Sequence, residues 1–518
     1  MIRLFVFLAL FACTRGGPSG PDARLSRQIV FSPCRLRGIA FPTQCGVLRV
    51  PEDRANPGGR STDGDRSPEH TTEEQASPAS PVAQASRSER TIDLRVALIP
   101  ALARDPAPDP LFLLAGGPGQ AATEALGTVV TALERVRRTR DLVLVDQRGT
   151  GSSGALECRL AAEDAPLQDL LSAEGFREDQ VLSCLHGYKA DVRRYTTTIA
   201  MQDLDDVRRA LGYETINLWG GSYGTRAALV YLREHGSHVR VAILDGVAPL
   251  SLRMPLYFAR DAQRSLDLLF DACAADATCK AAFPDLRSRF AALLERLASQ
   301  PARVTVSDPI TGRPTNVIIE HDAFVAMLRA VLYAPELASL LPLTIDRAAH
   351  GDFSPYVAQA ATLQRGFSGA MSLGLLFSIV CAEDAPAIAE GEMEREARNT
   401  FLGASVGRVF ERTCKIWPRE ELPKGYREPV RSDKAVLLLS GELDPVTPPS
   451  WAAEAAKTLP NSLQIVVPGV GHGATVVGCV PGIVARFLAE GSIANVDASC
   501  ARVQSRPPFF VSFAGPSP

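Results

Sequence analysis

The chain has 518 residues, of which 46% are hydrophobic and 22% are charged, and its formal net charge is −3. This length accommodates one large domain with a substantial insertion, or two to three ordinary domains, and the composition is that of a globular protein. The nearly balanced charge, without a long basic run, argues against a nucleic-acid partner, because phosphate binding requires a concentrated face of Lys and Arg side chains.

The N-terminus carries one positive charge followed by a wholly apolar run over residues 4–12. This run is too short to cross a bilayer, which needs about 20 apolar residues, but it fits a secretory signal peptide over residues 1–12. Leu10-Phe-Ala-Cys13 resembles a bacterial lipobox, which predicts lipidation of Cys13; the alternative is an ordinary signal peptide cleaved a few residues later. Both predict export, as a periplasmic or outer-membrane-anchored lipoprotein or as a secreted protein, with a lipid at Cys13 as the one expected membrane contact.

The cysteines support export, because disulfides persist in oxidising compartments. If Cys13 carries lipid, ten cysteines remain, and they fall in local couples: 34/45, 158/184, 273/279, 381/414 and 479/500. We predict a disulfide within each couple, although sequence alone does not fix the connectivity. The alternative is a set of buried thiols; no couple has the tight CxxC spacing of a zinc site.

The first ordered part of the chain follows a Gly/Pro/Arg-rich tether at residues 13–28. Short strands are predicted at 45–51 and at 91–99, where apolar and polar side chains alternate. The intervening residues, about 55–90, contain almost no large apolar group and cannot offset the entropy of ordering, so we predict a disordered insertion.

From residue 111 the sequence pattern changes: short apolar strands alternate with helices and end in glycine-rich loops. The strands are predicted at 111–114, 141–145, 215–219, 239–244, 435–440 and 463–467. Near-continuous Val, Ile and Leu indicate a mostly parallel sheet buried on both faces. In such sheets the chemistry lies at the carboxyl ends of the strands.

Residues 250–430 interrupt this rhythm with Ala-, Leu- and Arg-rich segments of helical spacing, such as 290–297. We interpret them as a mainly helical cap inserted between two strands. The cap divides the core into a first part, 29–249, and a second part, 431–500, which is followed by a C-terminal tail, 501–518.

Gly220-Gly-Ser-Tyr-Gly224 matches the G-x-S-x-G nucleophile elbow. In that motif the serine, here Ser222, occupies a sharp strand-to-helix turn, so the residues two positions away must lack bulk. A predicted strand precedes the motif and an apolar helical pattern follows it, which Gly236 can end. The context therefore predicts Ser222 as a nucleophile.

A nucleophilic serine needs a histidine base and a carboxylate that orients the base, and in this fold they follow in the order Ser, Asp or Glu, His. His472 lies between two glycines directly after a strand and is the only histidine downstream of Asp444. Asp444 follows the strand 435–440, and Glu442 competes with it for the same role. We predict a Ser222–His472–Asp444 triad, with backbone N–H groups of Tyr223 and Gly117 as the oxyanion hole.

These segments together resemble the proline iminopeptidase and tripeptidyl aminopeptidase branch of the α/β-hydrolases. The matching pieces are Gly116-Gly-Pro-Gly119, Asp146 to Gly154, Thr196 to Thr198 with Asp203 to Arg208, the elbow, Gly441 to Pro448, and Gly471-His-Gly473. The resemblance covers roughly residues 30–500 and implies an α/β-hydrolase fold with a cap. Ala115 stands where proline iminopeptidases usually have histidine, as in tripeptidyl aminopeptidase-like members.

The resemblance implies an exported serine peptidase that releases amino-terminal residues or short peptides from peptide substrates. Glu383 and Asp384, in the cap, are the candidates for binding the substrate ammonium; a salt-bridged loop is the alternative. A carboxylesterase with the same triad is the nearest rival function, and a non-catalytic lipoprotein that retains the fold is the second. No metal or dinucleotide is implied, because the glycine-rich loops lack G-x-G-x-x-G in a first strand–helix unit.

Overall fold

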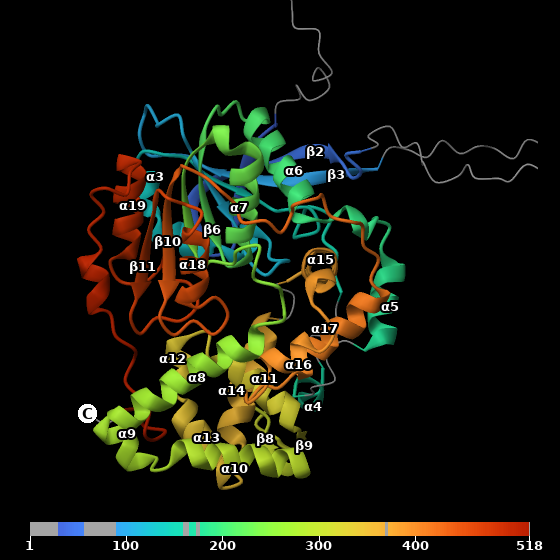
Figure 1. The fold of residues 1–518 in the computed structure, drawn as a ribbon, viewed down its shortest axis with the longest axis vertical. Coiled ribbons are helices and arrows are strands. Elements are labelled where there is room, and N and C mark those ends of the chain that lie inside the picture. Colours follow the sequence, from blue (N-terminus) through green and yellow to red (C-terminus); the bar gives the residue numbers. More distant parts are fainter. Residues whose placement is uncertain (1–28, 56–89, 159–164, 172–176, 368–370, 517–518) are drawn as a thin grey trace, which may run out of the picture.

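The computed structural model describes residues 29–55, 90–158, 165–171, 177–367 and 371–516. The predicted signal peptide, the lipidation site Cys13, the tether and nearly all of the 55–90 insertion lie outside these residues. A sheet flanked by helices forms one part of the molecule, and a mostly helical part lies beside it (Figure 1). None of the helices in the described ranges is long and apolar enough to cross a membrane.

The main sheet has nine strands in the order β1-β2-β3-β5-β4-β6-β7-β10-β11. Its first three strands pair antiparallel, as does β3 with β5, and every later pairing is parallel. The strands are β1 (Ser32–Leu36), β2 (Ile39–Pro51), β3 (Thr91–Ile99), β4 (Leu111–Leu114), β5 (Leu142–Val145), β6 (Ile216–Gly221), β7 (Val239–Asp245), β10 (Ala435–Gly441) and β11 (Ser462–Val467). The predicted α/β-hydrolase fold with a mostly parallel sheet is confirmed.

The central strands are apolar throughout because helices cover both faces of the sheet. Every residue of β4, β5 and β10 is buried. One face packs against α6 (Thr197–Ala210), α7 (Tyr223–His235) and α18 (Pro449–Ala456). The other packs against α2 (Gly127–Ala132), α3 (Glu134–Arg137) and α19 (Val480–Glu490). The adjacency of β6, β7, β10 and β11 brings the loops after these four strands together at one edge.

The cap has its own hydrophobic core, which includes Phe324, Phe353 and Tyr356. Its helices are α8 (Phe258–Ala275), α9 (Ala277–Ala282), α10 (Leu286–Ser299), α11 (His321–Val331), α12 (Pro335–Ala338), α13 (Leu341–Ala349), α14 (Ser354–Phe367), α15 (Leu373–Ile379), α16 (Glu392–Glu396) and α17 (Ser405–Ile416). A π-helical turn, Val380–Asp384, follows α15 directly. The helical character matches the expectation for residues 250–430.

Two features of the cap were not expected. A two-stranded antiparallel sheet, β8 (Ala302–Ser307) with β9 (Pro314–Ile319), interrupts the helices. A segment from before residue 250 also joins the cap, because α4 (Leu167–Leu170) lies against β9. There the Gln168 side chain donates to the Ile318 carbonyl at 3.2 Å and accepts from its N–H at 2.7 Å. The cap is thus built from two insertions into the sheet.

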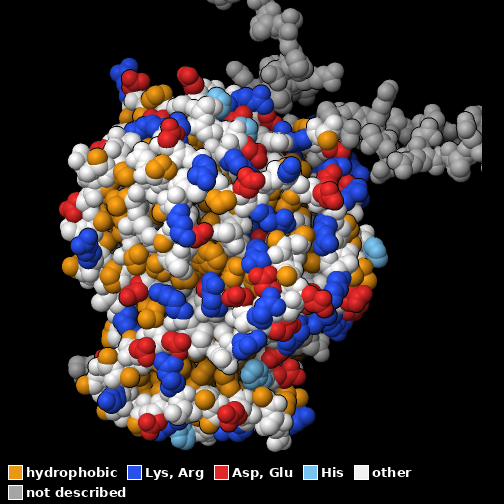
Figure 2. Space-filling view, in the orientation of Figure 1, with side chains coloured by type: hydrophobic (Ala, Val, Ile, Leu, Met, Phe, Trp, Pro, Cys, Tyr) orange, Lys and Arg blue, Asp and Glu red, His pale blue; other side chains and the backbone are white. Residues whose placement is uncertain are grey.

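All five predicted cysteine couples are disulfides in the structure. They join Cys34 to Cys45, Cys158 to Cys184, Cys273 to Cys279, Cys381 to Cys414 and Cys479 to Cys500. Five disulfides are typical of proteins that fold outside the cytoplasm. On the face seen in Figure 2, acidic and basic side chains are interspersed over both parts of the molecule.

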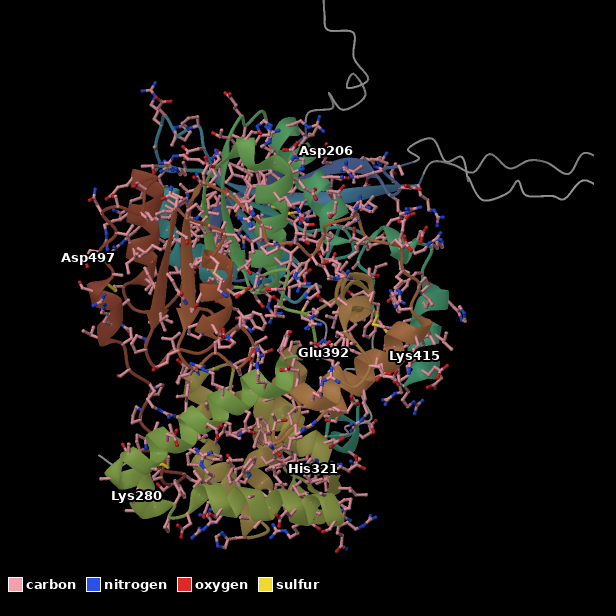
Figure 3. The ribbon with its side chains drawn as sticks, in the orientation of Figure 1. Asp206, Lys280, His321, Glu392, Lys415 and Asp497 are labelled. Carbon is pink, nitrogen blue, oxygen red and sulfur yellow. A yellow bond between two sulfur atoms is a disulfide. The ribbon has the colours of Figure 1, made fainter. Side chains whose placement is uncertain are left out.

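A buried ion network ties the N-terminal strands to the helical layer. Arg148 is fully buried, and its guanidinium donates two hydrogen bonds to Asp203 on α6, at 2.6 and 2.8 Å. A third hydrogen bond goes to the carbonyl of Glu52, just after β2, at 2.8 Å. Arg54 donates to Asp203 and to Asp206, which is labelled in Figure 3. The motifs Asp146 to Gly154 and Asp203 to Arg208, which carry the family resemblance, therefore have a structural function.

Replacing Asp203 with asparagine is expected to lower the free energy of unfolding by about 3–5 kcal/mol, because it leaves the buried Arg148 without its counter-ion. Urea denaturation followed by circular dichroism measures the change. Asp93→Asn is the matched control: it breaks an ion pair with Arg49 whose side chains are 51% and 63% exposed, so little change is expected. Equal effects of the two substitutions would contradict the structural role of Asp203.

Candidate active site

Ser222 lies between β6 and α7 in a strained backbone conformation, with φ 55° and ψ −122°. Such a conformation is unfavourable for a residue with a Cβ and is retained where the surroundings enforce it. A Cβ on Gly220 would overlap the backbone of Gly224, and one on Gly224 would overlap that of Leu114. The glycines of the motif are therefore required by backbone contacts, and the turn leaves the Ser222 side chain partly exposed.

The backbone of this turn is held from the neighbouring strand. The Ser222 N–H donates to the carbonyl of Asp245, at the end of β7, at 2.8 Å. The Thr225 hydroxyl donates to the Ser222 carbonyl at 2.6 Å and accepts from the Ala248 N–H at 2.8 Å. The serine thus has a fixed position relative to the loops that follow β7 and β10.

His472 and Asp444 are joined by a hydrogen bond. The Nδ1 atom of His472 lies 2.8 Å from Oδ2 of Asp444. The Asp444 side chain is completely buried, whereas that of His472 is 17% exposed. The other carboxylate oxygen, Oδ1, accepts from the N–H groups of Val446 and Thr447, each at 2.8 Å. This arrangement orients the imidazole and directs its Nε2 atom away from the carboxylate.

The environment keeps Asp444 ionised and makes His472 more basic. Burial would raise the pKa of Asp444, but His472 and the N–H donors of the loop hold that pKa below its usual value. Burial would likewise lower the pKa of His472, but the Asp444 carboxylate more than offsets it and raises the pKa above its ordinary value. A histidine in this setting accepts a proton more readily than a free imidazole.

Three side chains support the pair and were not found from the sequence. The Thr447 hydroxyl donates to Asp444 Oδ2 at 2.7 Å and lies 3.2 Å from His472 Nδ1. Asp245 accepts from the N–H groups of Ala474 and Thr475, at 2.8 and 2.7 Å, and so holds the histidine loop. Thr447 and Asp245 stand in strand-end motifs and could have been proposed from that position.

The third support comes from the cap. The carbonyl of Tyr333, after α11, accepts from the His472 N–H at 3.0 Å, and the Tyr333 ring lies edge-on to the imidazole with centroids 5.3 Å apart. No sequence signal links a residue of the cap to a loop about 140 positions later. Glu442, the competitor of Asp444, instead accepts from the Gly469 N–H at 3.0 Å.

Tyr223 and the loop that carries Gly117 both lie next to the serine. Tyr223 is the first residue of α7, and Gly116 lies against Ser222: a Cβ on Gly116 would come within 3.1 Å of the serine Cβ. Gly117 has φ +107°, a conformation that favours glycine. The same loop is held by the cap, because the Ser372 N–H donates to the Gly119 carbonyl at 2.9 Å. The donor assignment to Tyr223 and Gly117 stays a prediction.

Glu383 lies in the π-helical turn and is 1% exposed. Its carboxylate accepts from the Thr197 N–H at 2.6 Å, from the Thr197 hydroxyl at 2.9 Å and from the Tyr426 hydroxyl. The Thr197 hydroxyl also lies 2.8 Å from the hydroxyl of Tyr223. Glu383 therefore reaches the nucleophile turn through a chain of buried hydrogen bonds.

Asp384 is equally buried and pairs with Arg226 of α7, whose Nη1 lies 3.0 and 2.9 Å from the two carboxylate oxygens. Burial raises the pKa of Asp384 to about 6, with Arg226 opposing the rise. A substrate ammonium would have to compete with these partners, and the binding role predicted for the two acids stays a prediction.

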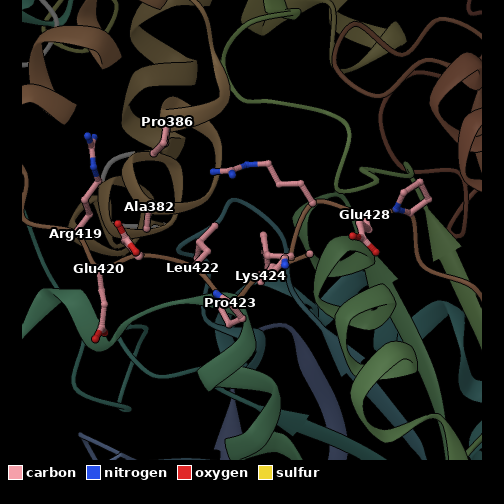
Figure 4. Close-up of a pocket in the computed structure, with 13 residues that line it drawn as sticks. Ala382, Pro386, Arg419, Glu420, Leu422, Pro423, Lys424 and Glu428 are labelled. Atoms are coloured by element: carbon pink, nitrogen blue, oxygen red, sulfur yellow. The ribbon is translucent and has the colours of Figure 1, made fainter.

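A cavity of about 870 Å³ opens near the outer side of this network. It is lined by residues 419–429 together with Ala382 and Pro386 (Figure 4). The cavity is lined by both basic and acidic side chains, for example Arg419, Lys424 and Glu428. None of the candidate triad residues lines it. Among the described residues, no cluster of three or more His, Cys, Asp or Glu side chains could hold a metal ion.

Comparisons with known proteins agree with this fold. Residues 109–317 match the family model described as alpha/beta hydrolase fold, and residues 399–500 match the one described as TAP-like protein. The serine protease Hip1 of Mycobacterium tuberculosis is 25% identical over 536 aligned positions, which cover 96% of each chain. The putative hydrolase YuaR of Escherichia coli is 22% identical and covers 73% of this chain and 77% of its own length.

Among solved structures, a proline iminopeptidase of Mycobacterium smegmatis is 16% identical, with a TM-score of 0.35, and covers 78% of this chain and 96% of its own. An esterase of Thermogutta terrifontis is 14% identical, with a TM-score of 0.33, and covers 79% and 97%.

Proposed function

Because this chain is a serine hydrolase of the α/β-hydrolase fold with a TAP-like segment, we propose that it is an exported peptidase that releases residues from free peptide N-termini. The observation that supports this most is the His472–Asp444 pair at the strand edge where the Ser222 turn lies. The choice of peptides over esters draws on the TAP-like segment and on the relative named as a serine protease.

In the proposed mechanism the Ser222 hydroxyl attacks the carbonyl of the scissile bond while His472 accepts its proton. Asp444 stabilises the resulting imidazolium and keeps the ring in the tautomer whose Nε2 is free to act as a base. The N–H groups of Tyr223 and Gly117 stabilise the oxyanion. His472 then returns the proton to the leaving amine, and water, activated by the same histidine, hydrolyses the acyl-enzyme.

A panel of chromogenic anilides tests this function. It contains Pro-, Ala- and Ala-Ala-Pro-anilides, each with a free and with a blocked amino group, together with a short-chain ester. Cleavage of free but not blocked peptides supports an aminopeptidase and reveals how many residues leave at once. Cleavage of the ester alone would support the carboxylesterase alternative. No turnover, with no labelling by a fluorophosphonate, would support a non-catalytic lipoprotein.

Glu383→Gln distinguishes two roles for the buried carboxylate. If Glu383 binds the substrate ammonium, KM for free peptides rises and blocked peptides become substrates. If it stabilises the turn, Tm falls and KM is unchanged. We expect the second result, with a loss of about 1–3 kcal/mol in unfolding free energy, because the glutamine amide cannot accept all three donors. A raised KM at an unchanged Tm would contradict this expectation.

Export is proposed on two grounds. The five disulfides indicate folding in an oxidising compartment. The sequence of residues 1–13 resembles a lipoprotein signal, and a lipid at Cys13 would retain the enzyme at a membrane surface while the domain faces its substrates.

A further inference from the structure

Arg329 lies at the end of α11, one helical turn before the tyrosine that contacts the candidate catalytic histidine. Its Nη2 atom donates to the Tyr333 hydroxyl at 3.2 Å. The guanidinium carbon lies 4.3 Å from the centre of the Phe258 ring and 5.5 Å from that of Tyr333. Tyr333 in turn contacts both the ring and the backbone N–H of His472. Two aromatic rings therefore hold Arg329 beside the catalytic pair.

The charge of Arg329 has no counter-ion in the part of the chain that the structure describes, where no carboxylate oxygen lies within 4.0 Å of it. Its Nε atom is buried and has no hydrogen-bond partner. Other arginines of the cap are paired: Arg253 with Glu392, and Arg289 with Asp346. A half-buried guanidinium has five N–H donors, of which the described residues accept only one, so the donors that face solvent are free to bind a carboxylate.

We propose that Arg329 binds a carboxylate of the substrate, carried by the portion that leaves as the amine; this inference rests on the peptidase function proposed above. His472 must approach the leaving nitrogen to protonate it, so the leaving portion lies on the His472 side of the scissile bond. Tyr333 links Arg329 to the imidazole, because its hydroxyl accepts from Nη2 and its ring contacts His472, so we place the arginine on that side. A carboxylate there accepts two parallel hydrogen bonds from a guanidinium whose orientation the rings already fix.

Two kinds of peptide carry such a carboxylate. One is a short peptide whose C-terminal carboxylate follows the scissile bond by a single residue; the other has an acidic side chain at that residue. The positive charge of Arg329 also opposes the rise in the pKa of His472. A bound carboxylate would neutralise that charge and make the histidine a stronger base when the correct substrate is present.

The test compares peptides that share one acyl portion, chosen with the anilide panel, and differ in the leaving residue: Ala with a free carboxylate, Ala amide, Glu amide and Gln amide. These four peptides form an alanine pair, acid and amide, and a Glu/Gln pair. In one of the two pairs, we expect the wild-type kcat/KM to be about tenfold to a hundredfold higher for the peptide with the carboxylate than for its uncharged partner. A preference within the alanine pair identifies the C-terminal carboxylate as the ligand. A preference within the Glu/Gln pair identifies an acidic side chain.

Arg329→Gln is expected to abolish that preference, because kcat/KM for the carboxylate substrate falls to the value for its amide partner. Arg329→Lys should retain part of it, because lysine keeps the charge without the planar fork. Arg303→Gln, which removes an exposed arginine of β8, is the matched control and should change neither rate.

Two results would overturn the proposal for Arg329 alone. One is efficient peptide cleavage by the wild type without a preference in either pair. The other is an equal loss for acids and amides in Arg329→Gln, which would mean that the arginine only positions Tyr333. Absence of peptide cleavage by folded wild-type enzyme would instead refute the peptidase function, and the proposal for Arg329 with it.

Discussion

Replacing Ser222 with alanine is expected to lower kcat by about a million-fold, because the substitution removes the proposed nucleophile while the proposed oxyanion donors and His472 remain. Hydrolysis of the best anilide measures the loss. The same variant should fail to react with a fluorophosphonate, whereas its Tm should stay close to that of the wild type.

Ser237→Ala is a suitable control, because this exposed serine follows the same helix, α7, and lies at its far end. Its activity and labelling should match the wild type. If Ser222→Ala retained more than a thousandth of the activity, or were still labelled, another nucleophile would have to be sought.

Asp444→Asn is the substitution with the second largest expected effect, a loss of about ten-thousand-fold in kcat at neutral pH. The asparagine oxygen would take the place of Oδ1, which accepts from Val446 and Thr447, so the NH2 group would face His472 Nδ1. A donor at that position forces the proton onto Nε2, where the base is needed. Kinetics with the best anilide measure the change.

The pH profile adds an independent readout. His472 must be neutral to accept a proton, so kcat/KM of the wild type falls as the pH drops below its raised pKa. Without the Asp444 carboxylate that pKa decreases, and the acid limb should move to lower pH. Glu442→Gln is the matched control, because Glu442 contacts Gly469 and not the histidine, and it should leave both the limb and the rate nearly unchanged. An acid limb that stays in place in Asp444→Asn would show that Asp444 does not act on His472.

The parallel part of the sheet was predictable because each of its strands combines two local signals, an apolar run and a glycine-rich loop at its end. The strand expected at 435–440 corresponds to Ala435–Gly441, and that expected at 463–467 to Ser462–Val467. The strand Ser32–Leu36 was missed because it is mostly exposed and has no apolar run, so that only its pairing with β2 defines it as a strand.

The hairpin of β8 and β9 was also missed, because helical segments flank it in the sequence. Val304 and Val306 alternate with polar residues in β8, but the run is only six residues long, and its polar positions are exposed. Likewise, the sequence of α4 does not indicate that this helix packs in the cap, because only the folded cap places Gln168 beside Ile318. Such contacts depend on tertiary packing and leave no local pattern.

The positions of Ser222, Asp444 and His472 could be proposed from the order of motifs, because each follows a strand that ends at the same edge. The environment of an acid could not be inferred in that way. Glu383 and Asp384 read as a polar loop beside a cysteine, yet both are buried, since Thr197, Tyr426 and Arg226 reach them from distant parts of the chain. Tyr333 and Arg329 were inaccessible to sequence reasoning for the same reason.

The five disulfides follow one another along the chain without nesting or crossing, and the residues that each joins are 6 to 33 positions apart. A chain that emerges from a translocation channel N-terminus first therefore completes each bond before the next cysteine couple appears. If Cys13 is lipidated or removed with the signal peptide, as proposed above, the two newest thiols are always each other's nearest partners. An oxidase that pairs cysteines in order of emergence would then produce the native set without an isomerase to correct it.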